Sequence, residues 1–278
     1  METLETELGR ARELAVDELA DAIESIGFEC TRCGGCCTGY EADGAHCDSD
    51  GGDDRDGETD PTRDDEREGS EREGSEREGS EREEAEREPH TATVFPDEIR
   101  DLADAASEEF AASYDWRDVA RPMPYGLHEN ADGDPVGETF EWAIATDDCG
   151  DCTFYEETDG QGACTVHDAR PLVCRTYPFS VALGGTNQPM GEAVDEAGMV
   201  RAHECEGLGR EIDRSDAEEL AAALKRRAVR EIEEAIAVRK AYDPSIRRRT
   251  GEDVVVFDSE GGKREDGTPI DVDDHRSE

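Results

Sequence analysis

The sequence has no apolar run long enough to cross a membrane. Its longest uninterrupted apolar stretches, such as Val254-Val255-Val256-Phe257, are far shorter than the roughly 20 residues that a membrane helix needs. No apolar segment of the secretory type follows Met1 either. These absences predict a soluble, cytoplasmic protein with no membrane partner, in a compartment where thiols stay reduced.

The sequence also lacks the short motifs of several enzyme classes. It has no phosphate-binding loop (G-x-x-x-x-G-K-[ST]), no H-E-x-x-H, no G-x-S-x-G and no dinucleotide-binding glycine pattern that opens a helix. The C-x-x-x-C-x-x-C spacing of radical S-adenosylmethionine enzymes is absent as well. No catalytic residue is therefore predicted, and whether the protein is an enzyme stays open.

Positive charge is scarce. The chain holds 30 Lys and Arg against 75 Asp and Glu, a formal net charge of −45. Residues 41–88 account for 22 of the acidic and 7 of the basic side chains, so a net charge of −30 remains on segments with clear apolar periodicity. A folded domain coated in carboxylates is typical of adaptation to high salt, where ions screen the repulsion. We therefore expect a halophilic protein, and nucleic acid is not an expected partner.

Large apolar side chains are missing from residues 41–88, which contain no Val, Ile, Leu, Met, Phe, Trp or Tyr. The sequence REGSE occurs there three times in tandem. Since nothing can be buried to offset the chain entropy, this segment is predicted to be a disordered, acidic, low-complexity insertion. It contains His46 beside Cys47, but nothing around them would hold a metal, so Cys47 is expected to be a free, unligated thiol.

Cysteine, by contrast, is abundant and clustered. The chain has ten cysteines, nine of them in two groups: Cys30, Cys33, Cys36 and Cys37, then Cys149, Cys152, Cys164, Cys174 and Cys205. Thiolates are soft donors suited to zinc or iron, and C-x-x-C spacing brings two sulfurs to one ion. A disulfide framework fits less well, because such frameworks belong to short secreted chains and a vicinal pair closes a strained ring. Buried, unligated cysteines would explain one or two of the ten, but not the clustering.

Eight thiolates in two sets of four would suit two four-coordinate zinc sites, or one or two iron–sulfur clusters. The predicted metal ligands are Cys30, Cys33, Cys36, Cys37, Cys152, Cys164, Cys174 and Cys205, with Cys149 at their margin. About a hundred residues separate the two groups, and looping out the insertion has a modest entropic cost. The two groups are therefore expected to meet in space and share a centre.

Charged and imidazole side chains flank the later cysteines. Arg170 and Arg175 stand on either side of Cys174, where their charge would either stabilise thiolates or pair with nearby acidic residues. His167 and His203 each lie within three residues of a motif cysteine. With so many thiols available, both are expected to be structural histidines rather than ligands.

The overall pattern predicts an α+β fold, a small, irregular, helix-rich domain with short strands around a cysteine-ligated metal centre. Apolar spacings of three and four predict flanking amphipathic helices over residues 2–26 and 215–242, the second capped at Ser215 and stopped by Pro244. Residues 173–181 are expected to be extended, and residues 254–257 to begin a hairpin that turns at Gly261-Gly262.

The expected domain organisation follows from these segments. Residues 1–40 and 89–245 are predicted to form a single cysteine-cluster domain, interrupted by the insertion at 41–88. Residues 246–278 are predicted to be an acidic tail that carries the hairpin.

The order of the cysteine motifs resembles the CxxCxxCC cysteine-cluster family, also called the YkgJ family. The resemblance is carried by C-x-x-C-x-x-C-C at 30–37, Cys152-Thr-Phe, CTVHDARPLVCRTYPF at 164–179 and Cys205-x-Gly207. It covers residues 28–40 and 90–210, and it implies chelation of zinc or iron. Two features depart from the family pattern: the insertion between the halves, and His167 where relatives often have an aromatic residue.

The leading hypothesis is a metal-binding protein that coordinates zinc or an iron–sulfur cluster through its clustered cysteines, with the metal structural, stored or transferred. An alternative is an iron–sulfur redox or protein-modifying enzyme, by analogy with flagellin lysine methylases, which carry a similar cysteine cluster. A further alternative is an interaction scaffold in which zinc holds a small core together. No sequence feature points to a particular protein partner.

Overall fold

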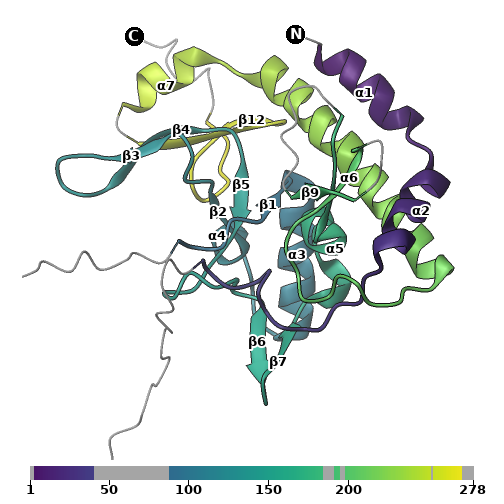
Figure 1. Ribbon diagram of the computed structural model, residues 1–278. Helices are drawn as coiled ribbons and strands as arrows, with labels where there is room; N and C mark the ends of the chain where they lie inside the picture. Colours follow the sequence, from purple (N-terminus) through teal and green to yellow (C-terminus); the bar gives the residue numbers. More distant parts are fainter. Residues whose placement is uncertain (1–2, 41–87, 184–190, 195–197, 252, 271–278) are drawn as a thin grey trace, which may run out of the picture.

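The computed structural model describes residues 3–40, 88–183, 191–194, 198–251 and 253–270 (Figure 1). The helices are α1 (Leu4–Glu13), α2 (Val16–Ile26), α3 (Pro96–Glu109), α4 (Trp116–Val119), α5 (Leu172–Thr176), α6 (Arg214–Ala241) and α7 (Pro244–Thr250), with a 3-10 turn at His167–Ala169. The strands are β1 (Thr93–Val94), β2 (Ala120–Pro122), β3 (Leu127–Glu129), β4 (Pro135–Thr139), β5 (Trp142–Ile144), β6 (Tyr155–Thr158), β7 (Gln161–Cys164), β8 (Phe179–Val181), β9 (Glu192–Ala193), β10 (Val200–Ala202), β11 (Val254–Asp258) and β12 (Gly261–Lys263). The fold is mixed α+β, as predicted.

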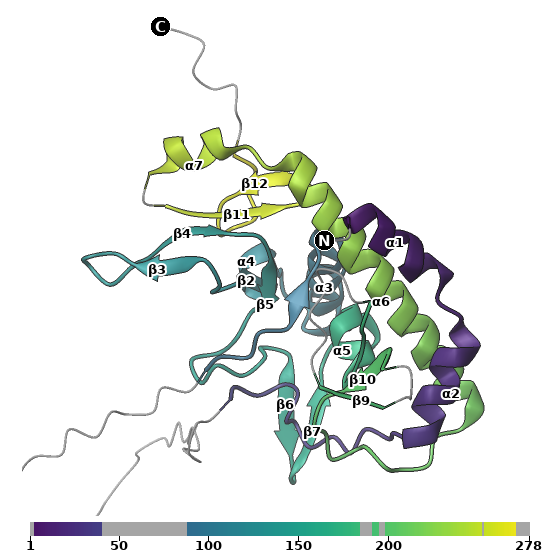
Figure 2. The same cartoon turned by 45° about the horizontal axis from the view of Figure 1, so that its top comes forward.

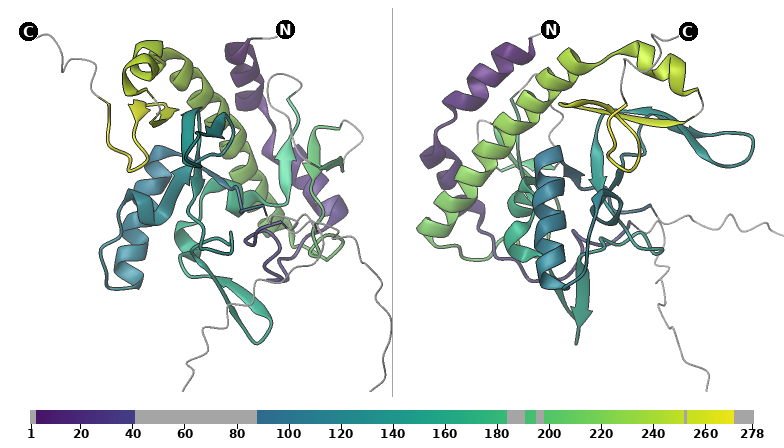
Figure 3. Two further views of the ribbon diagram at one scale, coloured as in Figure 1. Left: turned by 90° about the vertical axis from the view of Figure 1, so that its left-hand side faces the viewer. Right: turned by 180° about the vertical axis from the view of Figure 1, so that it is seen from behind.

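The strands of the described residues form four small sheets. Their orders are β1-β5-β2, β8-β10-β9, β12-β11-β4-β3 and β6-β7. All neighbours are antiparallel except β4 and β11, which run parallel. The β6–β7 hairpin projects from the body of the molecule in each view (Figure 3).

The long helix α6 packs against elements from both ends and the middle of the chain. Helices α1 and α2 lie along one side of it, and α5, β8 and β11 also contact it (Figure 2). Its buried stripe consists of Ala217, Ala221, Leu224, Ala228, Ile232 and Ile236, which share one apolar core with Leu19 and Ile23 of α2. These residues recur every three or four positions, which confirms the predicted helical period. None of the helices in the described ranges is both long and apolar enough to cross a membrane.

Both ends of α6 differ slightly from the expectation. The helix begins at Arg214 after an N-cap at Asp213, so Ser215 lies inside the first turn. Pro244, which was expected only to stop the helix, is the first residue of α7. Proline is favoured at this position because its missing N–H would have no helical partner there.

The prediction of one continuous N-terminal helix is wrong. Helices α1 and α2 are separated by Leu14 and Ala15, which have extended backbone with ψ of 128° and 120°. The ammonium group of Lys225 on α6 donates to the Leu14 carbonyl oxygen at 2.7 Å. In a continuous helix this oxygen would accept from the amide four residues later, so the contact with α6 stabilises the break.

The C-terminal hairpin is part of the core. β11 and β12 pair as expected, but the turn is at Ser259-Glu260 rather than at Gly261-Gly262. All five residues of β11 are buried, and this strand pairs with β4. Val254 and Val256 belong to a second apolar core together with residues of α3 and β5. Strands β11 and β12 therefore complete a sheet with β4 and β3.

A buried ion pair joins the two strands of this hairpin, and two tryptophans outside the hairpin contact it. Lys263 and Asp258 have side chains only 2% exposed, with Nζ 2.7 Å from Oδ2. Trp142 donates from Nε1 to the same carboxylate at 2.9 Å. Lys263 also reaches Glu260 at 2.7 Å and lies 4.7 Å from the centre of the Trp116 ring. The charge of each buried group thus depends on the other for compensation.

Removing the Lys263 ammonium group should therefore lower the free energy of unfolding of the domain. Lys263→Met would leave the Asp258 carboxylate buried without a cation, and we expect a loss of about 3–5 kcal/mol in the free energy of unfolding. Adding Asp258→Asn should recover part of that loss. Urea denaturation at constant high salt measures both.

The adjacent Arg264 provides the control, because its guanidinium group is half exposed and pairs with Asp253 at 3.5 Å. Arg264→Met should cost less than about 1 kcal/mol. Equal stability of Lys263→Met and Arg264→Met would contradict the structural role of the buried pair.

Candidate metal centre

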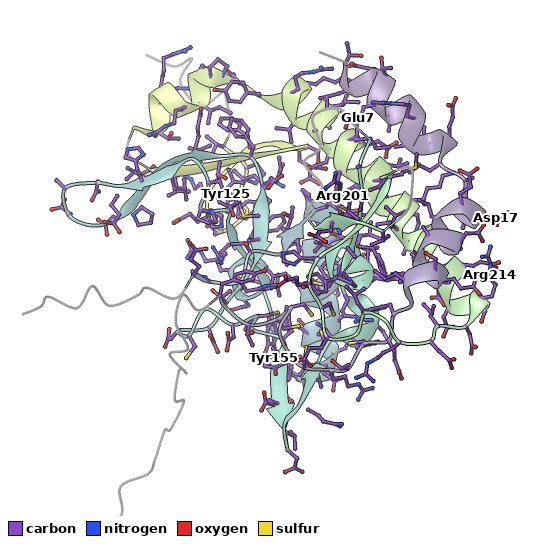
Figure 4. All side chains as sticks on the ribbon, viewed as in Figure 1. Glu7, Asp17, Tyr125, Tyr155, Arg201 and Arg214 are labelled. Atoms are coloured by element: carbon purple, nitrogen blue, oxygen red, sulfur yellow. The ribbon has the colours of Figure 1, made fainter. Side chains whose placement is uncertain are left out.

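Eight free cysteines line one cavity of about 2050 Å³. They are Cys30, Cys33, Cys36, Cys37, Cys152, Cys164, Cys174 and Cys205. The cavity continues along α6, where its wall includes Leu224 and Ile232. Figure 4 shows yellow sulfur atoms grouped above the labelled Tyr155, which also lines the cavity. Two cysteine groups that are far apart in the sequence thus face the same space.

Main-chain hydrogen bonds place the first cysteine group beside the second. The amide of Glu29 donates to Gly207 O at 3.0 Å, the amide of Gly162 donates to Arg32 O at 2.8 Å, and the amide of Cys152 donates to Cys37 O at 2.8 Å. Gly207 and Gly162 are each two residues from a later cysteine, and Cys152 is itself one. Backbone pairing along the whole C-x-x-C-x-x-C-C segment therefore brings the two groups together.

Gly34 allows this segment to turn while its backbone lies against Tyr155. Its φ is +78°, and a Cβ atom built on it would lie 2.2 Å from the Tyr155 hydroxyl oxygen. The Gly34 carbonyl accepts from the amides of Cys37 and Thr38, at 2.7 and 3.1 Å. Any other residue here would be strained in its backbone and would displace Tyr155. Tyr155 lies outside the cysteine motifs, so no motif marks it, and the sequence signal of the contact is the glycine opposite it.

Four of the eight cysteines belong to the second apolar core. Cys152 is 7% exposed, and Cys37, Cys164 and Cys174 pack against the same cluster. Cys174 lies on α5, so the expectation of extended chain from residue 173 is wrong there, although β8 does follow. The carboxylate of Glu98 accepts from the Leu172 amide at 2.8 Å and thereby supplies a partner at the start of this short helix.

The environment of the thiols separates their pKa values. Cys36 and Cys37 have their sulfurs 3.7 Å apart. This hydrogen bond lowers the pKa of Cys36 to about 7, with a further contribution from the charge of Arg170, and raises the pKa of Cys37. Burial raises the pKa of Cys152 to about 12 and also raises that of Cys174. Burial disfavours thiolates, and a bound cation would reverse this effect.

The eight sulfur donors suit a soft metal, although their side chains do not yet converge on one point. Within the described ranges, no three His, Cys, Asp or Glu side chains converge closely enough to hold a metal ion. The cavity nevertheless gathers eight sulfur donors, the ligands favoured by zinc and iron–sulfur clusters. Rotation about the Cα–Cβ bonds changes where these sulfurs point without moving the backbone. The chemistry of the residues therefore fits zinc or iron.

The other cysteines and the histidines near the motifs differ in their relation to the cavity. Cys149 is disulfide-bonded and is not among the residues that line the cavity. His46 and Cys47 lie outside the described residues. The His167 side chain is 63% exposed and lies beside Asp168 at 3.4 Å. His203 lines the cavity, and its Nδ1 is buried without a hydrogen-bond partner in the part of the chain that the structure describes.

The two arginines also line the cavity. The charge of Arg170 lowers the pKa of Cys36, Cys164 and Cys174, in each case against or beside larger effects of hydrogen bonding or burial. Its Nε donates to the His167 carbonyl oxygen at 3.0 Å, which fixes the guanidinium group near these thiols. Arg170 therefore supplies positive charge to the cysteine cavity, one of the two roles that the sequence left open.

Comparison with known proteins agrees with this chemistry. The family model CxxCxxCC, described as a putative zinc- or iron-chelating domain, matches residues 29–206. This span is more than half of the chain, and the protein belongs to that family. No curated protein and no solved structure matched the chain.

The contact between Gly34 and Tyr155 can be tested within the motif itself. Gly34→Ala should destabilise the protein by about 1–3 kcal/mol, because alanine is strained at positive φ and its Cβ would overlap Tyr155. Gly35→Ala is the matched control, since its Cβ would meet only Cys33 Sγ at 3.7 Å. The melting temperature and the amount of bound metal per chain should both fall for Gly34→Ala, and neither should fall for Gly35→Ala. If both variants behave alike, the turn at Gly34 does not position the motif.

Proposed function

We propose that the eight cysteines around the cavity bind zinc or an iron–sulfur cluster, and that holding this metal is the function of the protein. The observation that supports the proposal is that all eight free cysteines line one cavity. Without a cation, burial and neighbouring thiolates raise the pKa values of Cys152 and Cys174 and so disfavour their deprotonated forms. A bound cation would favour the deprotonated form of each ligand.

The chain's own residues would contribute in different ways. The cysteines would supply anionic sulfur ligands, and the zinc or cluster, when bound, would supply the positive charge that holds them together. Arg170 would add further positive charge beside Cys164 and Cys174. The apolar residues around Cys152 would limit access of water to the ligands.

Metal and sulfide analysis tests this proposal. Protein purified anaerobically from its own host should contain zinc, or iron with sulfide, in whole-number ratios to the chain. Cys174→Ser removes one sulfur from the cavity and should lower the bound metal by about half or more. Cys47→Ser lies outside the described residues and should leave the metal content unchanged. A wild-type chain with neither zinc nor iron would contradict the proposed function.

We further propose that the metal-binding domain consists of residues 1–40 and 89–245 together with the C-terminal hairpin, which shares its second apolar core. The acidic segment between the first two parts is proposed to be dispensable. The two ends of that segment are already paired. The Tyr40 amide donates to Glu88 O at 2.7 Å, and the Glu88 amide donates to Tyr40 O at 2.9 Å. This antiparallel pair is the geometry that a two-residue hairpin turn closes.

Residues 41–87 should therefore be replaceable by Asn-Gly. The shortened protein should bind the same amount of metal per chain, because its ends stay paired and a shorter loop costs less entropy to close. Elemental analysis at constant high salt measures the bound metal. Loss of metal on this replacement would show that the acidic segment takes part in the site.

A further inference from the structure

The short helix α5 carries Cys174 in the wall of the cysteine cavity, and a charged side chain from another helix holds each of its ends. Glu98 of α3 binds the first residue of α5, and Arg227 of α6 binds the last. We propose that Glu98 and Arg227 are positioning residues for the metal, which fix the place of Cys174 without touching the metal themselves. This inference rests on the proposed function.

Helix α5 needs such support because it is short. It has five residues, and Pro171 precedes it without a side-chain cap. An isolated helix shorter than about 12 residues is marginal in water. Cys174 is the middle residue of α5, so a displacement of the helix displaces its sulfur atom. A metal site tolerates ligand distances within only about 0.2 Å of their usual values. The position of α5 therefore bears on the affinity for the metal.

Glu98 fixes the start of α5. Its Oε1 accepts from the Leu172 amide at 2.8 Å, and its Oε2 accepts from the Phe95 amide at 3.1 Å. Phe95 is the N-cap of α3, so one carboxylate joins the first turns of two helices. Burial raises the pKa of Glu98, and the two amide hydrogen bonds act against this effect. A carboxylate is costly to bury unless such hydrogen bonds are made.

Arg227 fixes the end of α5. Its Nη1 donates to Thr176 Oγ1 at 3.0 Å and to Phe179 O at 3.3 Å. Thr176 is fully buried, and the Arg227 side chain is only 19% exposed. The charge of the guanidinium group is compensated by Glu231, whose carboxylate accepts from Nε at 2.7 Å. The same side chain thus holds the last residue of α5 and the first residue of β8.

The two attachments belong to one chain of hydrogen bonds that crosses α5. The Leu172 amide donates to Glu98, and the Leu172 carbonyl oxygen accepts from the Thr176 hydroxyl at 2.7 Å. The Thr176 oxygen in turn accepts from Arg227. Successive hydrogen bonds in a buried chain polarise and strengthen one another. Helix α5 is therefore held between α3 and α6, with Cys174 between the two attachments.

A purely structural role would have different consequences from a positioning role. Contacts that serve only the fold change the stability of the metal-free protein, and the folded fraction still binds metal with wild-type affinity. Contacts that position a ligand change the affinity of the folded protein itself. Residues that orient metal ligands typically cost about 10–100-fold in metal affinity when they are changed. The zinc affinity of folded variants therefore distinguishes the two roles.

Two substitutions in the full-length chain test the inference. Glu98→Gln keeps the size of the side chain but leaves one acceptor oxygen for two amides. Arg227→Met keeps most of its length and removes the donors. Each should weaken zinc binding by about ten-fold or more. Zinc affinity is measured by competition with a chromogenic chelator, under reducing conditions at high salt and well below every melting temperature. Arg227→Lys should recover part of the affinity.

Neighbouring residues provide matched controls. Asp97 pairs with Arg230 of α6 at 2.5 Å, and Arg226 is exposed. Within the described residues, neither side chain makes a hydrogen bond to α5. Asp97→Asn and Arg226→Met should therefore bind zinc with nearly wild-type affinity, since exposed charges contribute little. Cobalt-loaded protein gives a second readout, because the sulfur-to-cobalt charge-transfer absorption should change for the two positioning variants and not for the controls.

Cysteine variants test whether Glu98 acts through Cys174. Effects of residues that act through one another are not additive. Glu98→Gln should therefore cause no further loss of zinc affinity in a Cys174→Ser chain. In a Cys205→Ser chain it should cause the same loss as in the wild-type chain, because Cys205 is held by a different pairing, that of Glu29 with Gly207.

The possible failures are distinct. A positioning variant that binds zinc as tightly as its control would overturn the role of that residue while leaving metal binding intact. Equal losses for Glu98→Gln in the two cysteine backgrounds would show that it does not act through Cys174. Failure of both positioning variants to fold, with both controls folded, would overturn the inference in favour of a purely structural role. A wild-type chain that binds no zinc, iron or cobalt would overturn the proposed function, and this inference with it.

Discussion

The cavity depends on the backbone pairing of the C-x-x-C-x-x-C-C segment with three later parts of the chain. This segment forms no long helix or strand of its own, and its position is set by the bonds at Glu29, Arg32 and Cys37. Backbone hydrogen bonds contribute little net stability individually, but leaving them unmade in a buried place is costly. Together, these backbone bonds fix the positions of the main-chain segments that carry the eight thiols.

This arrangement requires a rigid support, which comes largely from residues outside the span matched to the family. Helix α6 packs against α1, α2 and α5, and thereby connects the N-terminal helices to the short helix that carries Cys174. The C-terminal hairpin adds β11 to the sheet, and the hydrogen bond from Trp142 of β5 to the buried Asp258 anchors the hairpin. Buried apolar residues of these flanking elements complete both of the large apolar cores of the domain.

The sequence predicted those features that depend on local pattern. The helical stripe of α6 and the pairing of the C-terminal hairpin were predictable because each pattern lies within one segment, although the hairpin turns two residues before the predicted position. The break after Leu14 was not, because its partner Lys225 lies 211 residues away. Helix α5 was missed for the same reason, since its first amide is satisfied by Glu98, 74 residues earlier.

The candidate site was predictable to a similar extent. Spacing alone identified cysteines as candidate metal ligands, because thiolate chemistry follows from residue type. It did not reveal which cysteines share a neighbourhood, since the bond from Cys152 to Cys37 and the apolar packing around both are tertiary. Nor did it reveal Tyr155 as the neighbour of Gly34. Residue type thus specified the chemistry, and long-range contacts specified the grouping.

X-ray absorption spectroscopy of the metal in protein isolated from its own host tests the central claim most directly. The account predicts a first coordination shell made of sulfur alone, at about 2.3 Å if the metal is zinc, with additional iron neighbours if the metal is an iron–sulfur cluster. A shell dominated by oxygen or nitrogen would contradict it, because the cavity gathers thiols as its metal donors.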